Sequence, residues 1–472
     1  MTKDFFIDIH CHPTLKPFGK LISNNYTTNN KNNTSLWYYN PPNLGDILLE
    51  NILGFSKYSQ SNLTASAYGE VHILGVSLYA PEVSFFKNKL GTSVISAEIE
   101  NIITEFGVKR INQIESKNYN YFNDLLEQIE YLKFYHNKTT TINNQKYKTF
   151  IISSMSDLEN FKKPSDCINI ALMLNIEGGH SLGCGKDPIN NPADESYVLS
   201  NLDKIKNCQF KPLYITLAHH FYNELCGHAK SIPPPVDKLL DQKYGLDTDF
   251  TNLGIKVLHK LLDNTNKKRI NIDIKHLSKK SRIKYFDILK TDYASQNIPI
   301  IFSHGGVTGL KNYNDKGTSQ TLFNTWDINL FDDEIILLAK SKGLFGLNFD
   351  QRIMGSENTI KEARNSFSRH KKLYNWSKLI WNNIEHIATI LDKNNLPSWD
   401  NICLGTDYDG IINPINKFWT EEEMPTFADY LNMHAFNFMK KGILSKQNLI
   451  ESEDIIDRVM RINAFNFMKN NF

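Results

Sequence analysis

The stretch Phe5-Phe6-Ile7-Asp8-Ile9-His10-Cys11-His12 places an apolar run directly before two histidines that are two residues apart. Alternate residues of a β-strand point to the same face, so a strand here would bring the imidazoles of His10 and His12 to one side. Two imidazoles on one side could share a metal ion. Cys11 would then point away from them, into the core. The stretch therefore predicts a buried strand that ends in a metal-binding pair.

Apolar runs of this kind recur along the chain, and longer segments with helical periodicity separate them. Runs that are apolar throughout suit parallel strands covered on both faces, and the intervening helices suit βα crossovers. One such helix is expected at residues 252–262, and another begins at Asp332, where three acidic residues complement the helix dipole. Eight strands are expected, at residues 5–9, 71–78, 170–176, 213–217, 270–274, 298–302, 344–347 and 402–404.

Eight strands that alternate with helices predict an α/β fold of the (β/α)8, or TIM-barrel, class, although a doubly wound sheet has a similar pattern. A chain of 472 residues, 41% of them hydrophobic, is within reach of one elaborated barrel, so we expect a single domain over residues 1–472. The stretch at about 79–169, between the second and third strands, is too long for an ordinary connection. Amphipathic segments near residues 97–106 and 121–134 indicate that it is a helical insertion on the barrel.

The composition narrows the class of partner. The formal net charge is +2 and the basic residues are scattered, so no nucleic-acid-binding surface is expected, and a small neutral or zwitterionic substrate fits better. The six cysteines form no Cys-x-x-Cys pair and are interpreted as reduced thiols. Because the sequence shows neither an export signal nor a membrane span, we expect a cytoplasmic protein.

Residues able to bind a metal or to move a proton follow most of the expected strands. Barrel enzymes build their active sites at the carboxyl ends of their strands. Glu177 precedes two glycines that permit a tight turn, and its carboxylate could bridge two metal ions. Any one such residue is more often structural, but their joint occurrence in barrel order favours one site. The candidates are His10, His12, Glu177, His219, His276, His304 and Asp407.

With these residues in place, the chain resembles the membrane (renal) dipeptidase family of the metal-dependent amidohydrolase superfamily. The resemblance rests on the order of short motifs that run nearly from end to end, and it is weakest over residues 79–169. The motifs are Asp8-x-His10, Asn175-Ile176-Glu177-Gly178-Gly179, Ile215-Thr216-Leu217-Ala218-His219, Thr251-Asn252-Leu253-Gly254, Asp273-Ile274-Lys275-His276-Leu277-Ser278, Pro299-Ile300-Ile301-Phe302-Ser303-His304, Asn329 with Asp332-Asp333-Glu334, and Gly405-Thr406-Asp407-Tyr408-Asp409-Gly410.

The resemblance implies a hydrolase with two divalent metal ions, zinc first among them, and a dipeptide substrate. Glu177 would be the bridging carboxylate. His10 and His12 would hold one ion, and His276 and His304 the other. His219 would lie beside the scissile carbonyl, and Asp407 would carry the proton transfers. A homodimer is suggested by the resemblance alone.

Two positions depart from the family pattern. His12 stands where the family carries Asp, which leaves the first metal site more electropositive and bears on the choice of metal. The family's Arg that pairs with the substrate carboxylate is not evident, since Asp327 and Ile328 stand at its place. Arg352, at the end of the seventh strand, is the expected substitute by position, and Asn223 is a further candidate for substrate binding.

The expected reaction is hydrolysis of a small amide, a dipeptide first, by metal-activated water with Asp407 as the proton shuttle. The departures leave open another amidohydrolase substrate, such as a lactone, a phosphoester or an N-acyl amino acid. A catalytically silent barrel that serves as a binding module is a third hypothesis. Retention of Glu177 and Asp407 argues against it.

Overall fold

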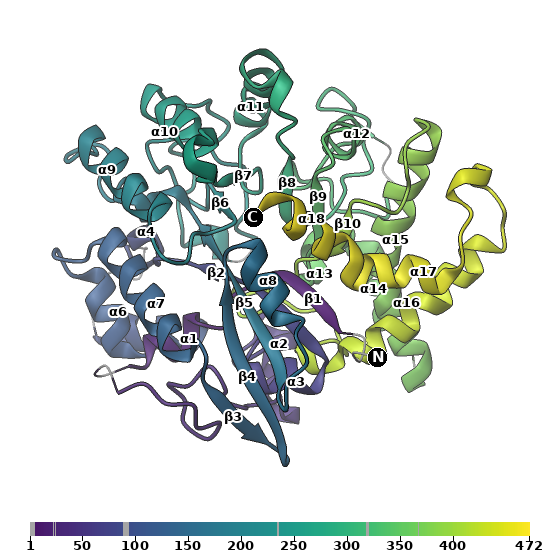
Figure 1. Ribbon diagram of the computed structural model, residues 1–472, viewed down its shortest axis with the longest axis horizontal. Helices are drawn as coiled ribbons and strands as arrows, with labels where there is room; N and C mark the ends of the chain where they lie inside the picture. Colours follow the sequence, from purple (N-terminus) through teal and green to yellow (C-terminus); the bar gives the residue numbers. More distant parts are fainter. Residues whose placement is uncertain are drawn as a thin grey trace. The chain divides into compact units, whose positions relative to one another are not determined.

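The computed structural model describes residues 5–472 except 22, 24, 88–93, 234–235, 318–320 and 367 (Figure 1). The chain divides into two compact units. The first contains Met1–Cys11, Tyr39–Gly75 and Pro299–Phe472, and the second contains His12–Tyr38 and Val76–Ile298. The single domain expected over residues 1–472 stays a prediction. No helix in the described part of the chain combines the length and the apolar character needed to cross a membrane.

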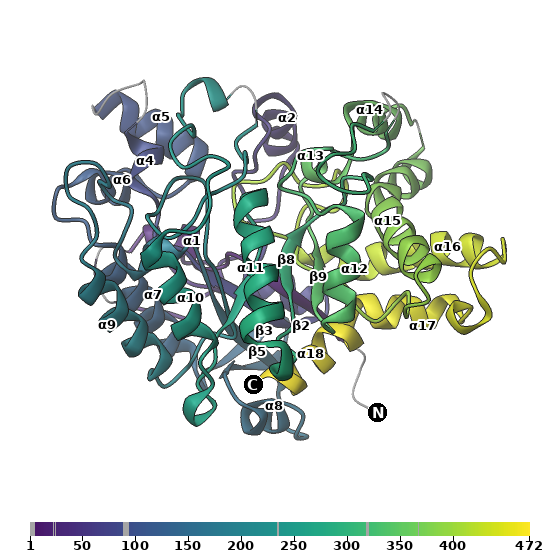
Figure 2. The ribbon, with the colours of Figure 1, turned by 90° about the horizontal axis from the view of Figure 1, so that it is seen from above.

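Parallel strands form the centre of the first unit. β1 (Phe6–Cys11) pairs with β10 (Ile402–Leu404), β10 with β9 (Leu344–Leu347), and β9 with β8 (Ile301–Gly305). These strands are almost completely buried, as the apolar runs that begin them predict. In Figure 2 the long helix α15 lies beside α14 and α16. The helices of this unit are α2 (Leu44–Leu53), α3 (Leu63–Tyr68), α12 (Asp332–Lys340), α13 (Gln351–Met354), α14 (Glu357–Arg364), α15 (Arg369–Lys393), α16 (Met424–Met439), α17 (Ser452–Asp457) and α18 (Asn463–Asn471).

The second unit has its own parallel core. β5 (Ile168–Glu177) pairs with β6 (Tyr214–Thr216), and β6 pairs with β7 (Asn271–Asp273). The second barrel strand, β2 (Val71–Leu78), begins in the first unit and ends in this one. The helices of this unit are α1 (Leu15–Gly19), α4 (Val83–Phe86), α5 (Val94–Thr104), α6 (Val108–Glu115), α7 (Tyr121–Tyr135), α8 (Met155–Phe161), α9 (Glu195–Lys206), α10 (Asn252–Leu262) and α11 (Lys279–Asp292).

Every strand expected from the sequence is present, and helices separate each from the next. β2 also pairs with β5, a closing pair that an open doubly wound sheet lacks, so the fold is of the α/β, TIM-barrel class, as predicted. Three of the eight strands have the expected bounds, and the others are shifted by one to three residues at their ends. The helix expected at residues 252–262 is α10, and the one expected to begin at Asp332 is α12.

The stretch at 79–169 is helical only in part. α5 and α7 lie where amphipathic segments were expected, but β3 (Thr139–Ile142) and β4 (Gln145–Ile152) form an antiparallel hairpin between α7 and α8 (Figure 1). β4 continues the sheet by pairing in parallel with β5. Asn143 and Asn144 make the turn, both with positive φ, which is the backbone that a two-residue type I′ turn requires. The alternation of exposed and buried residues in these strands is the signal that the helical expectation missed.

A buried ion pair joins α6 to α7 in the second unit. Arg110 Nη1 lies 2.6 Å from Asp124 Oδ1, and both side chains are almost fully buried. The guanidinium also lies over the rings of Phe18 and Tyr119. Burial would lower the pKa of Arg110, but the Asp124 carboxylate outweighs burial and raises it. The pair is therefore charged and held in one arrangement.

Replacing Arg110 with Met should lower the free energy of unfolding by about 3–5 kcal/mol, because it leaves the Asp124 charge buried without its partner. Chemical denaturation of the wild type and the variant measures this loss. The double variant Arg110→Met, Asp124→Leu removes both charges and should recover much of the stability. A double variant no more stable than the single one would show that packing of the Arg110 stem, not the charge of Asp124, sets the cost.

Candidate active site

Glu177, the last residue of β5, lies among three imidazoles of the second unit. Its Oε2 is 3.0 Å from Nε2 of His12. Its Oε1 is 3.7 Å from Nε2 of His219 and 3.6 Å from Nε2 of His276. All four side chains are buried. The two oxygens of one carboxylate thus face different imidazoles. Each oxygen could therefore bind a metal ion together with the imidazole that it faces.

The local backbone explains how Glu177 reaches this position. Gly178 follows it with a backbone φ of 91°, a conformation that residues other than glycine rarely adopt. A Cβ at Gly178 would also lie 2.2 Å from the His180 ring. The chain can therefore turn sharply at the end of β5 while the carboxylate stays inside. His276, which follows β7, turns in the same left-handed region with φ of 64°.

Burial keeps one of these imidazoles uncharged. It lowers the pKa of His276 to about 3, although the hydrogen bond to Glu177 acts in the opposite direction. Its neighbour His220 also has a pKa well below the usual value because of burial and the adjacent imidazoles, and its Nδ1 lies 2.6 Å from Ser231 Oγ. A neutral imidazole has a free electron pair on one ring nitrogen, so the neutral form is the one that binds a metal.

His219 differs from these residues because a second carboxylate contacts it. Glu82 Oε2 lies 2.6 Å from Nδ1 of His219. Burial alone would lower the pKa of His219, but the carboxylates of Glu82 and Glu177 outweigh burial and raise it. The sequence analysis did not single out Glu82. Its position four residues beyond β2, the one expected strand without an assigned residue after it, is the signal that could have found it.

A second group of candidate residues lies in the first unit. The rings of His10, from β1, and His304, from β8, stack with centroids 3.9 Å apart. Nε2 of His304 lies 4.0 Å from Oδ2 of Asp407. The buried carboxylate of Asp8 accepts hydrogen bonds from the backbone N–H of His10 and from both the N–H and the hydroxyl of Thr406. Asp8 thereby joins the end of β1 to the loop after β10, which brings His10 close to Asp407.

Asp407 is held by its backbone as well as by its side chain. Its φ of 63° is left-handed, a region that Asp tolerates better than most residues, and its N–H donates to the carbonyl of His10. Asn348, just beyond β9, donates from Nδ2 to Asp407 Oδ2 at 3.3 Å. Sequence reasoning also missed Asn348. Cys11, expected to point into the core, is fully buried.

The two residues assigned to substrate binding have partners of their own. The guanidinium of Arg352 binds both carboxylate oxygens of Asp350, two residues before it. Asn223 is buried, where its amide donates to the carbonyl of Leu217 and its oxygen accepts from two backbone N–H groups of the following loop. Their assignment to substrate binding stays a prediction.

The residues present fit a divalent metal. Glu177, His219 and His276 each offer one ligand atom, and these atoms lie within 4.8 Å of one another. Carboxylate oxygen and imidazole nitrogen are the donors that catalytic zinc and related ions use. The second unit thus gathers His12, Glu177, His219 and His276, and the first gathers His10, His304 and Asp407. Which of these residues share an ion stays a prediction.

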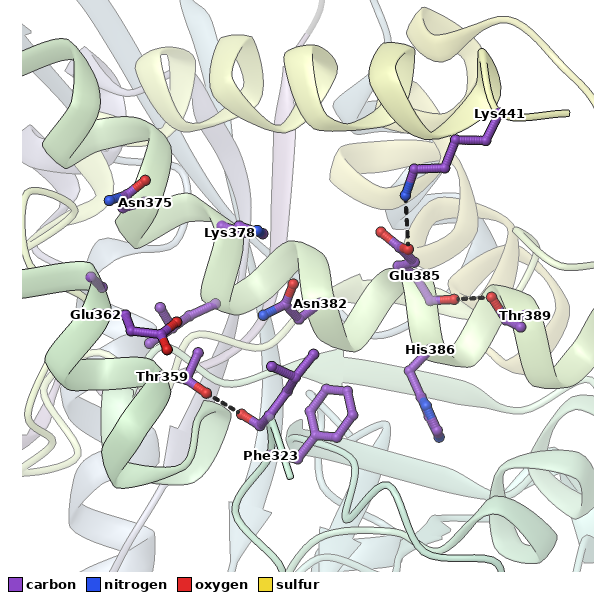
Figure 3. A pocket seen from close by; sticks show the side chains of 13 residues that line it. Phe323, Thr359, Glu362, Asn375, Lys378, Asn382, Glu385, His386, Thr389 and Lys441 are labelled. Carbon is purple, nitrogen blue, oxygen red and sulfur yellow. Dashed lines mark hydrogen bonds and ion pairs between the residues drawn. The ribbon is translucent and has the colours of Figure 1, made fainter. Parts of the chain in front are cut away.

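A pocket of about 490 Å³ lies elsewhere in the first unit, beside α14 and α15. Figure 3 shows its lining, in which Glu385 forms an ion pair with Lys441 and the Thr359 hydroxyl donates a hydrogen bond to the carbonyl of Leu322, next to Phe323. None of the seven candidate metal and catalytic residues lines this pocket. It therefore adds nothing to the assignment of the active site.

A TIM-barrel fold whose strand ends carry a buried carboxylate among imidazoles defines the class of metal-dependent hydrolases. The chain belongs to the membrane dipeptidase family, peptidase family M19, whose model matches residues 108–437. It is therefore a metallopeptidase by family, as the resemblance implied. The matched residues include Glu177, His219, His276, His304 and Asp407, whereas His10 and His12 precede the match.

Solved structures are similar in fold but distant in sequence. A metallopeptidase from Rhodobacter sphaeroides, bound to a phosphinate mimic of the dipeptide L-Ala-D-Ala, has a TM-score of 0.52 and 10% identity, with 99% of each chain covered. A dipeptidase AC of family M19 has a TM-score of 0.49 and 12% identity, covering 88% of this chain and 90% of its own. The probable dipeptidase PvdM from Pseudomonas aeruginosa has a TM-score of 0.47 and 12% identity, covering 87% and 88%. No curated protein sequence matches the chain.

Proposed function

We propose that this protein hydrolyses the peptide bond of dipeptides and that two divalent metal ions, with zinc as the expected ion, serve the reaction. The observation that carries the proposal is the carboxylate of Glu177, whose two oxygens face different buried imidazoles. Family membership and the dipeptide mimic bound by the Rhodobacter sphaeroides metallopeptidase support the substrate class. The residues proposed to hold the metal are His10, His12, Glu177, His276 and His304.

Bound divalent ions of this kind lower the pKa of water and polarise a carbonyl group. The residues of the chain would bind and orient the substrate and move the proton. Asp407 would accept a proton from the attacking water and return it to the leaving amine, with the hydrogen bond from Asn348 holding its carboxylate in place. His219 would direct Nε2 toward the carbonyl oxygen and stabilise the negative charge that develops there.

A second candidate function, hydrolysis of another amidohydrolase substrate, has one observation in its favour. The guanidinium of Arg352 is already paired with the carboxylate of Asp350, so it is only partly available for the carboxylate of a dipeptide. A substrate without a free carboxylate, such as a lactone, would not need that contact. We place this reading second because the family match supports a dipeptide.

Purified protein loaded with zinc should contain about two metal equivalents per chain and should hydrolyse dipeptides in a screen of L-L, L-D, N-acyl and lactone substrates. Removal of the metal by a chelator should abolish the activity, and readdition of zinc should restore it. Turnover of N-acyl or lactone substrates alone would replace dipeptides by the second candidate. Metal-free protein with full activity would refute both.

Two further properties of the protein are proposals that rest on sequence alone. A cytoplasmic location can be tested by cell fractionation. A homodimer, which only the family resemblance suggests, can be tested by light scattering of the purified protein. Neither property is needed for the proposed reaction.

A further inference from the structure

Glu82 directly precedes α4, but its side chain does not cap the helix. It occupies the position before Val83, the first residue of that helix, yet its side chain makes no hydrogen bond to the first turn. The side chain is turned inward instead, and the residue is 3% exposed. A carboxylate is costly to bury unless hydrogen bonds or opposite charges compensate for its lost hydration. Its partners therefore indicate why it is there.

Three donors surround the Glu82 carboxylate, all in the second unit. Oε2 lies 2.6 Å from Nδ1 of His219 and accepts from the Tyr79 hydroxyl at 3.3 Å. Oε1 accepts from the backbone N–H of Phe221 at 3.1 Å. The Tyr79 ring also packs against the His219 ring, with centroids 4.9 Å apart. Glu82 thus binds both the side chain of His219 and the backbone two residues beyond it.

We propose that Glu82 is a positioning residue for the hydrolytic reaction, because its carboxylate holds the imidazole of His219 through Nδ1 and directs Nε2 toward Glu177. This inference rests on the proposed function, in which His219 acts at the scissile carbonyl. The hydrogen bond made by one ring nitrogen of a histidine determines the role of the other. Since Nδ1 donates to Glu82, Nε2 is the nitrogen that faces Glu177 at 3.7 Å.

The chemistry of the contact requires a carboxylate. Glu accepts at both oxygens, so it can bind His219 and Phe221 at the same time. Gln has nearly the same shape but only one acceptor oxygen, and its amide group would meet a donor on the other side. Glu82→Gln therefore breaks one of the hydrogen bonds to His219 and Phe221 with little change in side-chain volume. Its effect thus reports on the positioning of His219 and not on a loss of packing.

The test compares zinc-loaded wild type, Glu82→Gln, His219→Ala and the double variant on a dipeptide that the wild type cleaves. Glu82→Gln should lower kcat by about 10–100-fold, by analogy with the loss of a partner that orients a metal-binding histidine, with KM and metal content nearly unchanged. In the His219→Ala background, Glu82→Gln should cause no further loss of kcat, because Glu82 acts through His219.

Glu224→Gln is the matched control. The Glu224 carboxylate accepts from the backbone N–H groups of Gly185 and Ala193 in the same unit, and among the described residues it forms no hydrogen bond or ion pair with a histidine. This variant should lose thermal stability while keeping kcat. If Glu82→Gln lowers thermal stability as Glu224→Gln does but leaves kcat unchanged, the role of Glu82 is purely structural and the proposal is overturned. Equal further losses of kcat in the wild-type and His219→Ala backgrounds would overturn it as well.

Crystal structures of the wild type and Glu82→Gln test the contact without reference to activity. A His219 ring that turns or moves away from Glu177 in the variant supports the positioning role. A ring that stays in place although its Nδ1 has lost the hydrogen bond to residue 82 refutes it. If the wild type cleaves no dipeptide, the proposed function fails, yet the crystal structures still decide whether Glu82 orients His219. The two failures are therefore distinguishable.

Discussion

Replacing Asp407 with Asn should reduce kcat by about 10²–10⁴-fold, the range that loss of a general acid and base produces, while the bound metal stays in place. Asn has the size of Asp, and its side-chain oxygen can still accept the hydrogen bond from Asn348. It has no carboxylate that can take a proton and return it. The left-handed backbone at this position suits Asn as well as Asp, so the loop should keep its shape.

Steady-state kinetics and metal analysis of Asp407→Asn measure this effect. Asp409→Asn is a suitable control in the same loop, because the Asp409 carboxylate accepts hydrogen bonds from Gln60 and Ser61. That variant should be less stable but should keep most of its kcat. Asp407→Asn with full activity would remove Asp407 from the proton transfers, and loss of metal would assign it to the metal site.

Replacing Glu177 with Gln should remove both activity and metal. The carboxylate supplies the negative charge among His12, His219 and His276, and its two oxygens face different imidazoles. An amide has no charge and one acceptor oxygen, so it can serve only one side. We expect metal content to fall by at least half and dipeptide hydrolysis to fall to background.

Metal content per chain, measured with activity at increasing zinc concentration, tests this expectation. Glu224→Gln again serves as the control, because it removes a carboxylate of the same unit that contacts backbone N–H groups. It should retain its metal. A Glu177→Gln variant with full metal content and normal turnover would refute the role of Glu177 as a metal-binding carboxylate and would undermine the proposed function.

The order of strands and helices was predictable because most of the strands are built on apolar runs, although polar residues such as Asn271 and Asp273 of β7 interrupt some of them. β2, β9 and β10 have the expected bounds, since burial on both faces leaves a continuous hydrophobic run that is easily read. The hairpin β3–β4 was missed because one of its faces is partly exposed, which gives a weaker alternating pattern inside a long helical stretch. Its Asn143-Asn144 turn is nevertheless a local signal.

Contacts between residues far apart in the chain were not predictable in the same way. Arg352 was chosen as a substrate contact from its position at a strand end, but its pairing with Asp350 became visible only in the folded chain. Glu82 lies 137 residues from His219, and its inward direction depends on how the loop after β2 packs. A sequence position alone does not specify side-chain direction in such a loop.

The sequence by itself determined the fold class, the family, and the His10 and His12 pair at the end of the first strand. These features depend on local hydrophobic patterns and on motifs whose order survives at low identity. Only the tertiary structure decided that His12 lies against Glu177, that the His10 ring stacks on His304, and that Glu82 holds His219. The physical reason is that strand pairing and loop packing, which join distant parts of the chain, set the distances between side-chain atoms.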